Sequence, residues 1–120
     1  MNDDVVRLFD VDTVDFLGLE KGSGDVILTL VDDFDWQDEV RHMALLKEKI
    51  NRYFDFIDSG EVYDQVEKIV GRSIPKSTPI KISVLEKYEP TEEGYRFLEH
   101  VKRISKEAGV DFAFKKFKKF

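Results

Sequence analysis

The sequence contains no cysteine, and only three prolines, two histidines and one tryptophan among its 120 residues. Without cysteine the protein has no disulfide, no thiol nucleophile and no thiolate ligand for zinc. Long apolar runs are also missing, whereas a membrane-spanning helix needs about 20 consecutive apolar residues. The first residues, MNDDVVRLFDVD, are acidic where a secretory signal is cationic and then apolar. We therefore expect a soluble, cytoplasmic protein with no membrane partner.

The apolar content is sufficient for a packed core. Apolar residues make up 42% of the chain and include ten phenylalanines. A chain of this length forms one domain of ordinary size. We predict a single domain over residues 1–120, with its core between about residues 12 and 114. Residues 1–11 and 115–120 are predicted to be frayed ends.

The net charge of −6 is unevenly distributed along the chain. Residues 1–64 contain 17 acids and 6 bases, a net of −11, whereas residues 65–120 contain 8 acids and 13 bases, a net of +5. An acidic first half disfavours general nucleic-acid binding, because phosphate repels it. The two halves either offset each other in the folded chain or leave an acidic face for a partner.

Two β-rich segments open the predicted fold. Residues 14–19 and 26–31 are separated by EKGSGD, whose two glycines supply the positive φ angles of a hairpin turn. The second segment is apolar at nearly every position, which is typical of a central strand covered on both faces. We therefore predict an antiparallel hairpin whose second strand lies inside the sheet.

A long helix is predicted over residues 36–58, with Asp33 or Asp35 as its cap and Ser59-Gly60 as its end. Its apolar residues follow helical spacing and should form the stripe that packs on the sheet. Tyr53 lies at the edge of that stripe, whose members are Trp36, Val40, Met43, Leu46, Ile50, Phe54 and Ile57.

The second half repeats this alternation of elements. A shorter helix is predicted over residues 62–70, a strand at 80–84, a helix from Thr91 to Gly109 and a last strand at 110–114. A strand–helix–strand unit implies a right-handed crossover and a parallel strand pair. The order ββααβαβ thus predicts a two-layer α+β domain, in which helices pack on one face of a four-stranded mixed sheet.

The sequence HMALLKEKINRYFDFIDSGE, residues 42–61, resembles a family of small bacterial proteins of unknown function. The shared pattern is His-x-x-x-Leu-x-x-Lys-Ile-Asn-x-Tyr-x-x-Phe-Ile-x-Ser-Gly, followed later by Tyr-x-Pro-x-x-x-Gly. The resemblance extends over about residues 12–114 and implies a stand-alone bacterial domain, but no activity. The matching residues are Trp36, His42, Leu46, Lys49, Ile50, Asn51, Tyr53, Phe56, Ile57, Ser59, Gly60, Tyr88, Pro90, Gly94, Phe97 and Leu98.

Few side chains indicate catalysis or metal binding. The acidic run DDFDWQD resembles the start of a calcium loop, but Asp38 and Ala44 stand where an EF-hand requires glycine and glutamate. His42 and Lys49 share one flank of the long helix and could act as an acid–base pair, although no nucleophile is spaced to join them. We predict that both are structural, and we assign no catalytic residue, no metal site and no cofactor.

Two apolar residues fit this packing poorly. Leu45 is predicted to point away from the stripe, and Phe56 lies off its other edge. Exposed apolar residues on one helix suggest further covered surface, supplied by a second copy or by a partner protein. The candidate interaction surface therefore comprises Leu45 and Phe56 with the flanking His42 and Lys49.

The expected function is binding without catalysis. An acidic face would bind another protein or a second copy of the chain, as immunity-type and accessory proteins do. One alternative is a nucleic-acid accessory protein that uses the tail FKKFKKF, whose lysines otherwise protect an edge strand from pairing. The other is an enzyme that uses His42 and Lys49. The lysines of this basic tail are Lys115, Lys116, Lys118 and Lys119.

Overall fold

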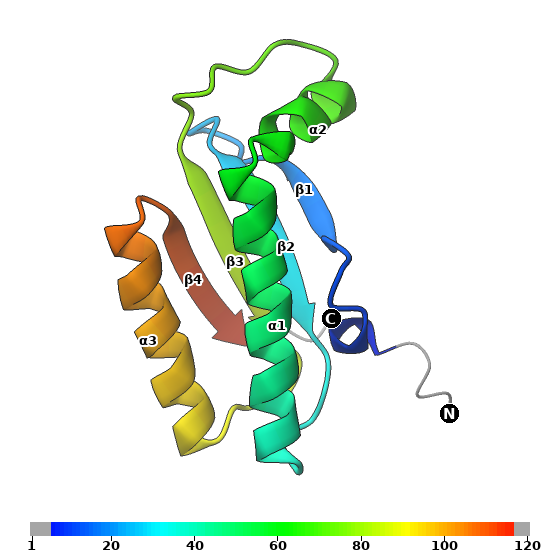
Figure 1. The fold of residues 1–120 in the computed structure, drawn as a ribbon, viewed down its shortest axis with the longest axis vertical. Coiled ribbons are helices and arrows are strands. Elements are labelled where there is room, and N and C mark those ends of the chain that lie inside the picture. Colours follow the sequence, from blue (N-terminus) through cyan, green and yellow to red (C-terminus); the bar gives the residue numbers. More distant parts are fainter. Residues whose placement is uncertain (1–5, 117–120) are drawn as a thin grey trace.

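A computed structural model describes residues 6–116 and has a mixed β-sheet with helices on one face (Figure 1). The predicted α+β class, element order and four-stranded sheet are confirmed. The elements are η2 (Arg7–Phe9), β1 (Phe16–Leu19), β2 (Val26–Asp32), α1 (Glu39–Asp58), α2 (Glu61–Val70), β3 (Ile80–Glu86), α3 (Glu92–Glu107) and β4 (Asp111–Lys116).

The strands are ordered β1-β2-β3-β4, so neighbours in the sheet are also neighbours in the sequence. β1 and β2 form the predicted antiparallel hairpin, with Gly22 and Gly24 at positive φ in its turn. β2 pairs in parallel with β3, and β3 in parallel with β4. As predicted, β2 is an interior strand.

The two long helices lie side by side on the sheet and run in the same direction (Figure 1). Thr91 caps α3 as predicted, because its hydroxyl accepts a hydrogen bond from the Gly94 N–H. The cap and start predicted for α1 are wrong: the helix begins at Glu39, and Asp38 accepts from the Arg41 N–H.

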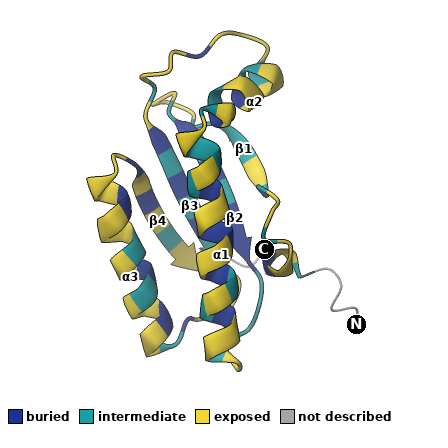
Figure 2. Ribbon diagram, viewed as in Figure 1, coloured by how far each residue is buried: buried dark blue, intermediate teal, exposed yellow. Residues whose placement is uncertain are grey.

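Helix α1 buries a different face from the one that its apolar spacing predicted. Four side chains of the helix have no exposed surface: His42, Leu46, Lys49 and Tyr53. Val40 belongs to the predicted stripe but is 77% exposed. Figure 2 shows the exposed positions along the outward side of α1. Relative to the prediction, the helix is rotated about its own axis. In this orientation His42 and Lys49 reach polar partners at the ends of the strands and in the amino-terminal segment.

Residues 6–11 are part of the fold. Residues 1–11 were predicted to be a frayed end; residues 1–5 of this range lie outside the described residues, whereas Leu8 is fully buried in the core. The Asp33 carboxylate accepts hydrogen bonds from the backbone N–H groups of Arg7 and Leu8. Asp33 therefore anchors this segment beside the end of β2 and does not cap α1.

Candidate functional site

Two acidic side chains end the central parallel strands. Asp32 closes β2 and Glu86 closes β3, and the two residues are direct partners in the sheet register. Both follow the inward alternation of their strands, so they lie on the helix-covered side. Asp32 has no exposed surface and Glu86 only 1%. The carboxyl ends of parallel strands are where α/β sheets commonly place functional groups.

His42 on α1 binds one of these acids. Its Nε2 lies 2.7 Å from an Asp32 carboxylate oxygen, and its Nδ1 lies 2.8 Å from the Asp35 carbonyl oxygen. A carbonyl oxygen can only accept, so Nδ1 carries a proton and donates it. The hydrogen bond between Nε2 and Asp32 needs one further proton, held by either group. The pair therefore gives His42 a fixed orientation in the core.

Glu86 is a protonated acid in this cluster. Burial away from water and the neighbouring Asp32 carboxylate raise the pKa of Glu86 to about 10. Among residues 6–116, no N–H or hydroxyl group donates to the Glu86 carboxyl, whereas a protonated Glu86 can itself donate a hydrogen bond to the Asp32 carboxylate, which also raises the pKa of Glu86. At neutral pH, Glu86 is thus neutral, which avoids placing two negative carboxylates side by side in the core.

The Trp36 indole covers this cluster from the helix side. Its ring stacks on the His42 imidazole, with centroids 3.6 Å apart and an angle of 13° between the planes. Gly94 in the first turn of α3 makes room for it, because a Cβ there would lie 2.7 Å from two atoms of the indole. Trp36 therefore connects the start of α3 to the buried histidine.

A second buried network surrounds Lys49. Its ammonium group donates to the Asp15 carboxylate at 3.0 Å and to the Arg7 carbonyl oxygen at 2.9 Å. The Tyr53 hydroxyl accepts from the Asp15 N–H and donates to the Thr29 carbonyl oxygen. Burial raises the pKa of Tyr53, so this hydroxyl stays protonated. The network joins α1 to β2 and to the residues before β1, beyond the end of the pairing between β1 and β2.

The placement of His42 and Lys49 on an interaction surface is wrong. Neither side chain has any exposed surface. They are also not joined as an acid–base pair, because His42 binds Asp32 whereas Lys49 binds Asp15. The prediction that both are structural agrees with this burial. Among residues 6–116, no group of three or more histidine and acidic side chains could hold a metal ion.

The other candidate residues lie on opposite sides of the domain. Leu45 and Phe56 are half-buried and pack against the core rather than pointing outward. Phe56 lines a shallow hollow with Asp12 and other residues at the carboxyl end of α1. Lys115 and Lys116 are exposed on β4, and Lys116 lies 3.7 Å from Glu89. Lys118 and Lys119 fall outside the described residues.

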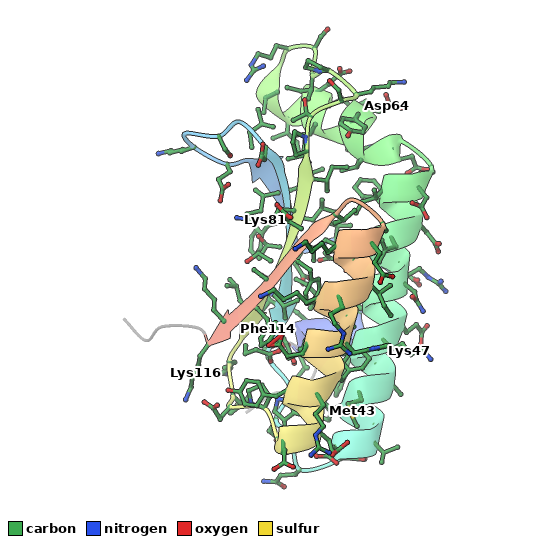
Figure 3. The ribbon with its side chains drawn as sticks, turned by 90° about the vertical axis from the view of Figure 1, so that its left-hand side faces the viewer. Met43, Lys47, Asp64, Lys81, Phe114 and Lys116 are labelled. Atoms are coloured by element: carbon green, nitrogen blue, oxygen red, sulfur yellow. The ribbon has the colours of Figure 1, made fainter. Side chains whose placement is uncertain are left out.

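An apolar groove lies between α1 and α3. Its volume is about 490 Å³. Ile104 in its wall is 49% exposed, and Met43, Phe54 and Phe97 are half-buried. Figure 3 shows Met43 and Lys47 where α1 passes beside α3. The residues of the groove are Met43, Ala44, Lys47, Ile50, Asn51, Phe54, Phe97, His100, Val101 and Ile104.

Several of these residues were missed by reasoning from the sequence. Asp32 and Glu86 could have been found, because each continues the inward alternation of an apolar strand by one more step. The groove could not have been found in the same way. Its α1 wall was assigned to the core, since apolar spacing does not show which part of a stripe a second helix leaves uncovered.

The chain belongs to a family of unknown function, DUF6572, whose model matches residues 6–118. This confirms the resemblance to a small domain of unknown function. No curated protein shows significant similarity to the chain, and no solved structure does. Within residues 6–116 of this DUF6572 protein, no helix is long and apolar enough to cross a membrane.

Proposed function

We propose that this DUF6572 domain binds another protein without catalysing a reaction, and that the groove between α1 and α3 receives the partner. One observation carries the proposal. Three of the seven residues of the predicted apolar stripe, Met43, Ile50 and Phe54, line this groove. Apolar recesses between helices are common places for binding sites.

The groove offers enough apolar surface to contribute to affinity. Burying an exposed valine, leucine or isoleucine side chain completely contributes about 1.5–3 kcal/mol. Ile104 is 49% exposed, and the aromatic side chains of Phe54 and Phe97 are partly exposed to a smaller extent. A partner that covers all three would gain part of this free energy at each position.

The polar clusters support binding rather than catalysis. Asp32, His42 and Lys49 have no exposed surface, so no substrate can reach them without a rearrangement of the core. Each is held by hydrogen bonds to its neighbours. We therefore assign these groups a structural role. Their hydrogen bonds fix the rotation of α1 about its own axis.

The acidic face expected from the sequence is a weaker candidate surface. Asp12 and Asp55 line the hollow beside Phe56, but Arg52 lies in the same hollow. Its guanidinium lies 2.9 Å from the Asp12 carboxylate and 3.7 Å from that of Asp55. The local negative charge is already partly offset, which favours the apolar groove as the partner site.

A photo-crosslinking side chain introduced at Ala44, in the groove, tests the proposal in the cells from which the protein comes. The matched control carries the same side chain at Asp64, which is exposed on α2. We expect a discrete adduct with another protein from position 44 only, and its loss when Ile104→Glu is added. Equal adducts from both positions, or adducts that survive Ile104→Glu, would refute the groove as the site.

A further inference from the structure

We propose that the occupant of the groove is an amphipathic helix with an acidic residue near its centre. This inference rests on the proposed function and specifies the chemistry of the partner. It follows from the shape of the groove, from the scarcity of backbone hydrogen-bonding partners in its walls, and from the charge along its rim.

The two walls of the groove are helical rows. On α1 the row runs from Met43 through Lys47 and Ile50 to Phe54, and on α3 it runs from Phe97 to Ile104. These positions follow the i, i+3, i+4 and i+7 spacing, which presents ridges and grooves to a third helix. The row on α1 spans 12 residues, and its 11 steps at the helical rise of 1.5 Å per residue give a length of about 16 Å. A partner helix of about three turns would fill it.

An extended peptide fits these walls less well. A strand placed between two helices must hydrogen-bond its N–H and C=O groups to side chains, because the backbone groups of both walls are already used within the helices. Seven of the ten residues of the groove are apolar, and the polar ones are Lys47, Asn51 and His100. A helix satisfies its own backbone and needs only apolar contact.

The charge of the groove is positive. None of its residues is acidic. Lys47 on one wall faces α3, and within residues 6–116 it forms no ion pair with a carboxylate. Arg103 does not line the groove, but its guanidinium lies 3.5 Å from Nδ1 of His100, which does. A carboxylate on the exposed side of a bound helix could reach both walls, which selects an acidic partner although the whole chain is acidic.

This positive rim separates the proposed occupant from two others. A small apolar molecule fits a volume of about 490 Å³, since ligand sites commonly range over about 300–1,000 Å³. Such a molecule, however, carries no negative group that could pair with the Lys47 ammonium. A second copy would present helix α1 or α3 of its own, and the outward side of α1 carries Val40, Ala44 and Glu48. The charge therefore disfavours a small apolar molecule; the proposed occupant is a helix of another protein, and the experiment separates it from both alternatives.

A library of random 16-residue peptides, selected on the immobilised full chain, identifies the preferred chemistry. The selected peptides are then labelled and titrated by fluorescence anisotropy. We expect helical spacing of apolar residues with a central Asp or Glu. Replacing that acid by Lys should weaken binding about two- to fivefold, the range for an exposed ion pair. The affinity of the Lys peptide should be restored with the Lys47→Glu variant. The control variant Lys68→Glu, on α2, should bind both peptides with wild-type affinity.

Each outcome separates this inference from the proposed function. Peptides whose binding is lost in Ile104→Glu but unchanged in Lys47→Glu would refute the acidic partner. They would still support the groove as the binding site. Peptides that bind Ile104→Glu as well as wild type would overturn both. A dimer seen by light scattering and lost in Ile104→Glu would assign the groove to a second copy. A small molecule retained in native mass spectrometry and lost in that variant would assign it to an apolar ligand.

Discussion

Replacing Glu86 by glutamine should stabilise the protein above neutral pH. In the folded state, burial and the adjacent Asp32 carboxylate raise the pKa of Glu86 from 4.5 to about 10. In the unfolded state Glu86 ionises near pH 4.5, so unfolding releases a proton at every pH between these two values. The contribution of the protonated acid to stability is therefore complete below about pH 4.5 and is lost progressively as the pH rises toward 10.

The magnitude follows from the same two pKa values. Each pH unit above the unfolded value changes the free energy of unfolding by about 1.4 kcal/mol, which gives up to about 3 kcal/mol at pH 7. Glutamine has nearly the same shape as the protonated acid and has no proton to lose. We therefore expect Glu86→Gln to be more stable than wild type by up to this amount at pH 7 and to gain little at pH 4.5.

Urea denaturation at pH 5, 6, 7 and 8 measures this difference. Trp36 is the only tryptophan and reports unfolding by fluorescence. Glu99→Gln on the exposed side of α3 is the matched control and should reproduce the pH dependence of wild type. Two results would refute the assignment of a neutral buried acid. One is a free energy of unfolding that changes with pH in the same way for Glu86→Gln and wild type, and the other is a Glu86→Gln variant that is less stable than wild type at pH 8.

Three further substitutions test the packing around α1. Gly94→Ala should lower the free energy of unfolding by about 1–3 kcal/mol, because its Cβ would overlap Trp36; an unchanged urea midpoint and tryptophan spectrum would contradict that contact. Lys49→Met should lower it by about 3–5 kcal/mol, since the Asp15 carboxylate stays buried without its cation, and Asp15→Asn in the same background should recover part of the loss. Tyr53→Phe should lower it by about 1–3 kcal/mol in calorimetry, because two buried backbone groups lose their partner; a neutral effect would show that the hydroxyl is not needed.

The elements of the fold were predictable because their signals are local. The glycine-rich turn before Val26, the cap at Thr91 and the stop at Gly60 each depend on a few neighbouring residues. The nearly continuous apolar character of residues 26–31 also predicted that β2 is an interior strand. The parallel pairing of β3 with β4 then followed from the handedness of the crossover between them.

The orientation of α1 was not predictable from the same signals. Its apolar spacing indicated a stripe through Val40 and Met43, but the buried face is centred on His42 and Lys49. A buried histidine or lysine needs a partner of opposite charge, and the two partners, Asp32 and Asp15, come from other parts of the chain. Spacing within one helix contains no information on these long-range contacts, so the groove and the pairing of His42 and Lys49 with their acids could be seen only in the folded chain.

The order of the strands has a consequence for synthesis on the ribosome. Val26 pairs with Ile80, so the central parallel contact joins residues 54 positions apart. The hairpin and the whole of α1 leave the ribosome before β3 exists, and one edge of β2 has no neighbour during that interval. Contacts of such long range form slowly. Until β3 arrives, the hydrogen bonds of His42 with Asp32 and of Tyr53 with Thr29 can hold the nascent helix over β2.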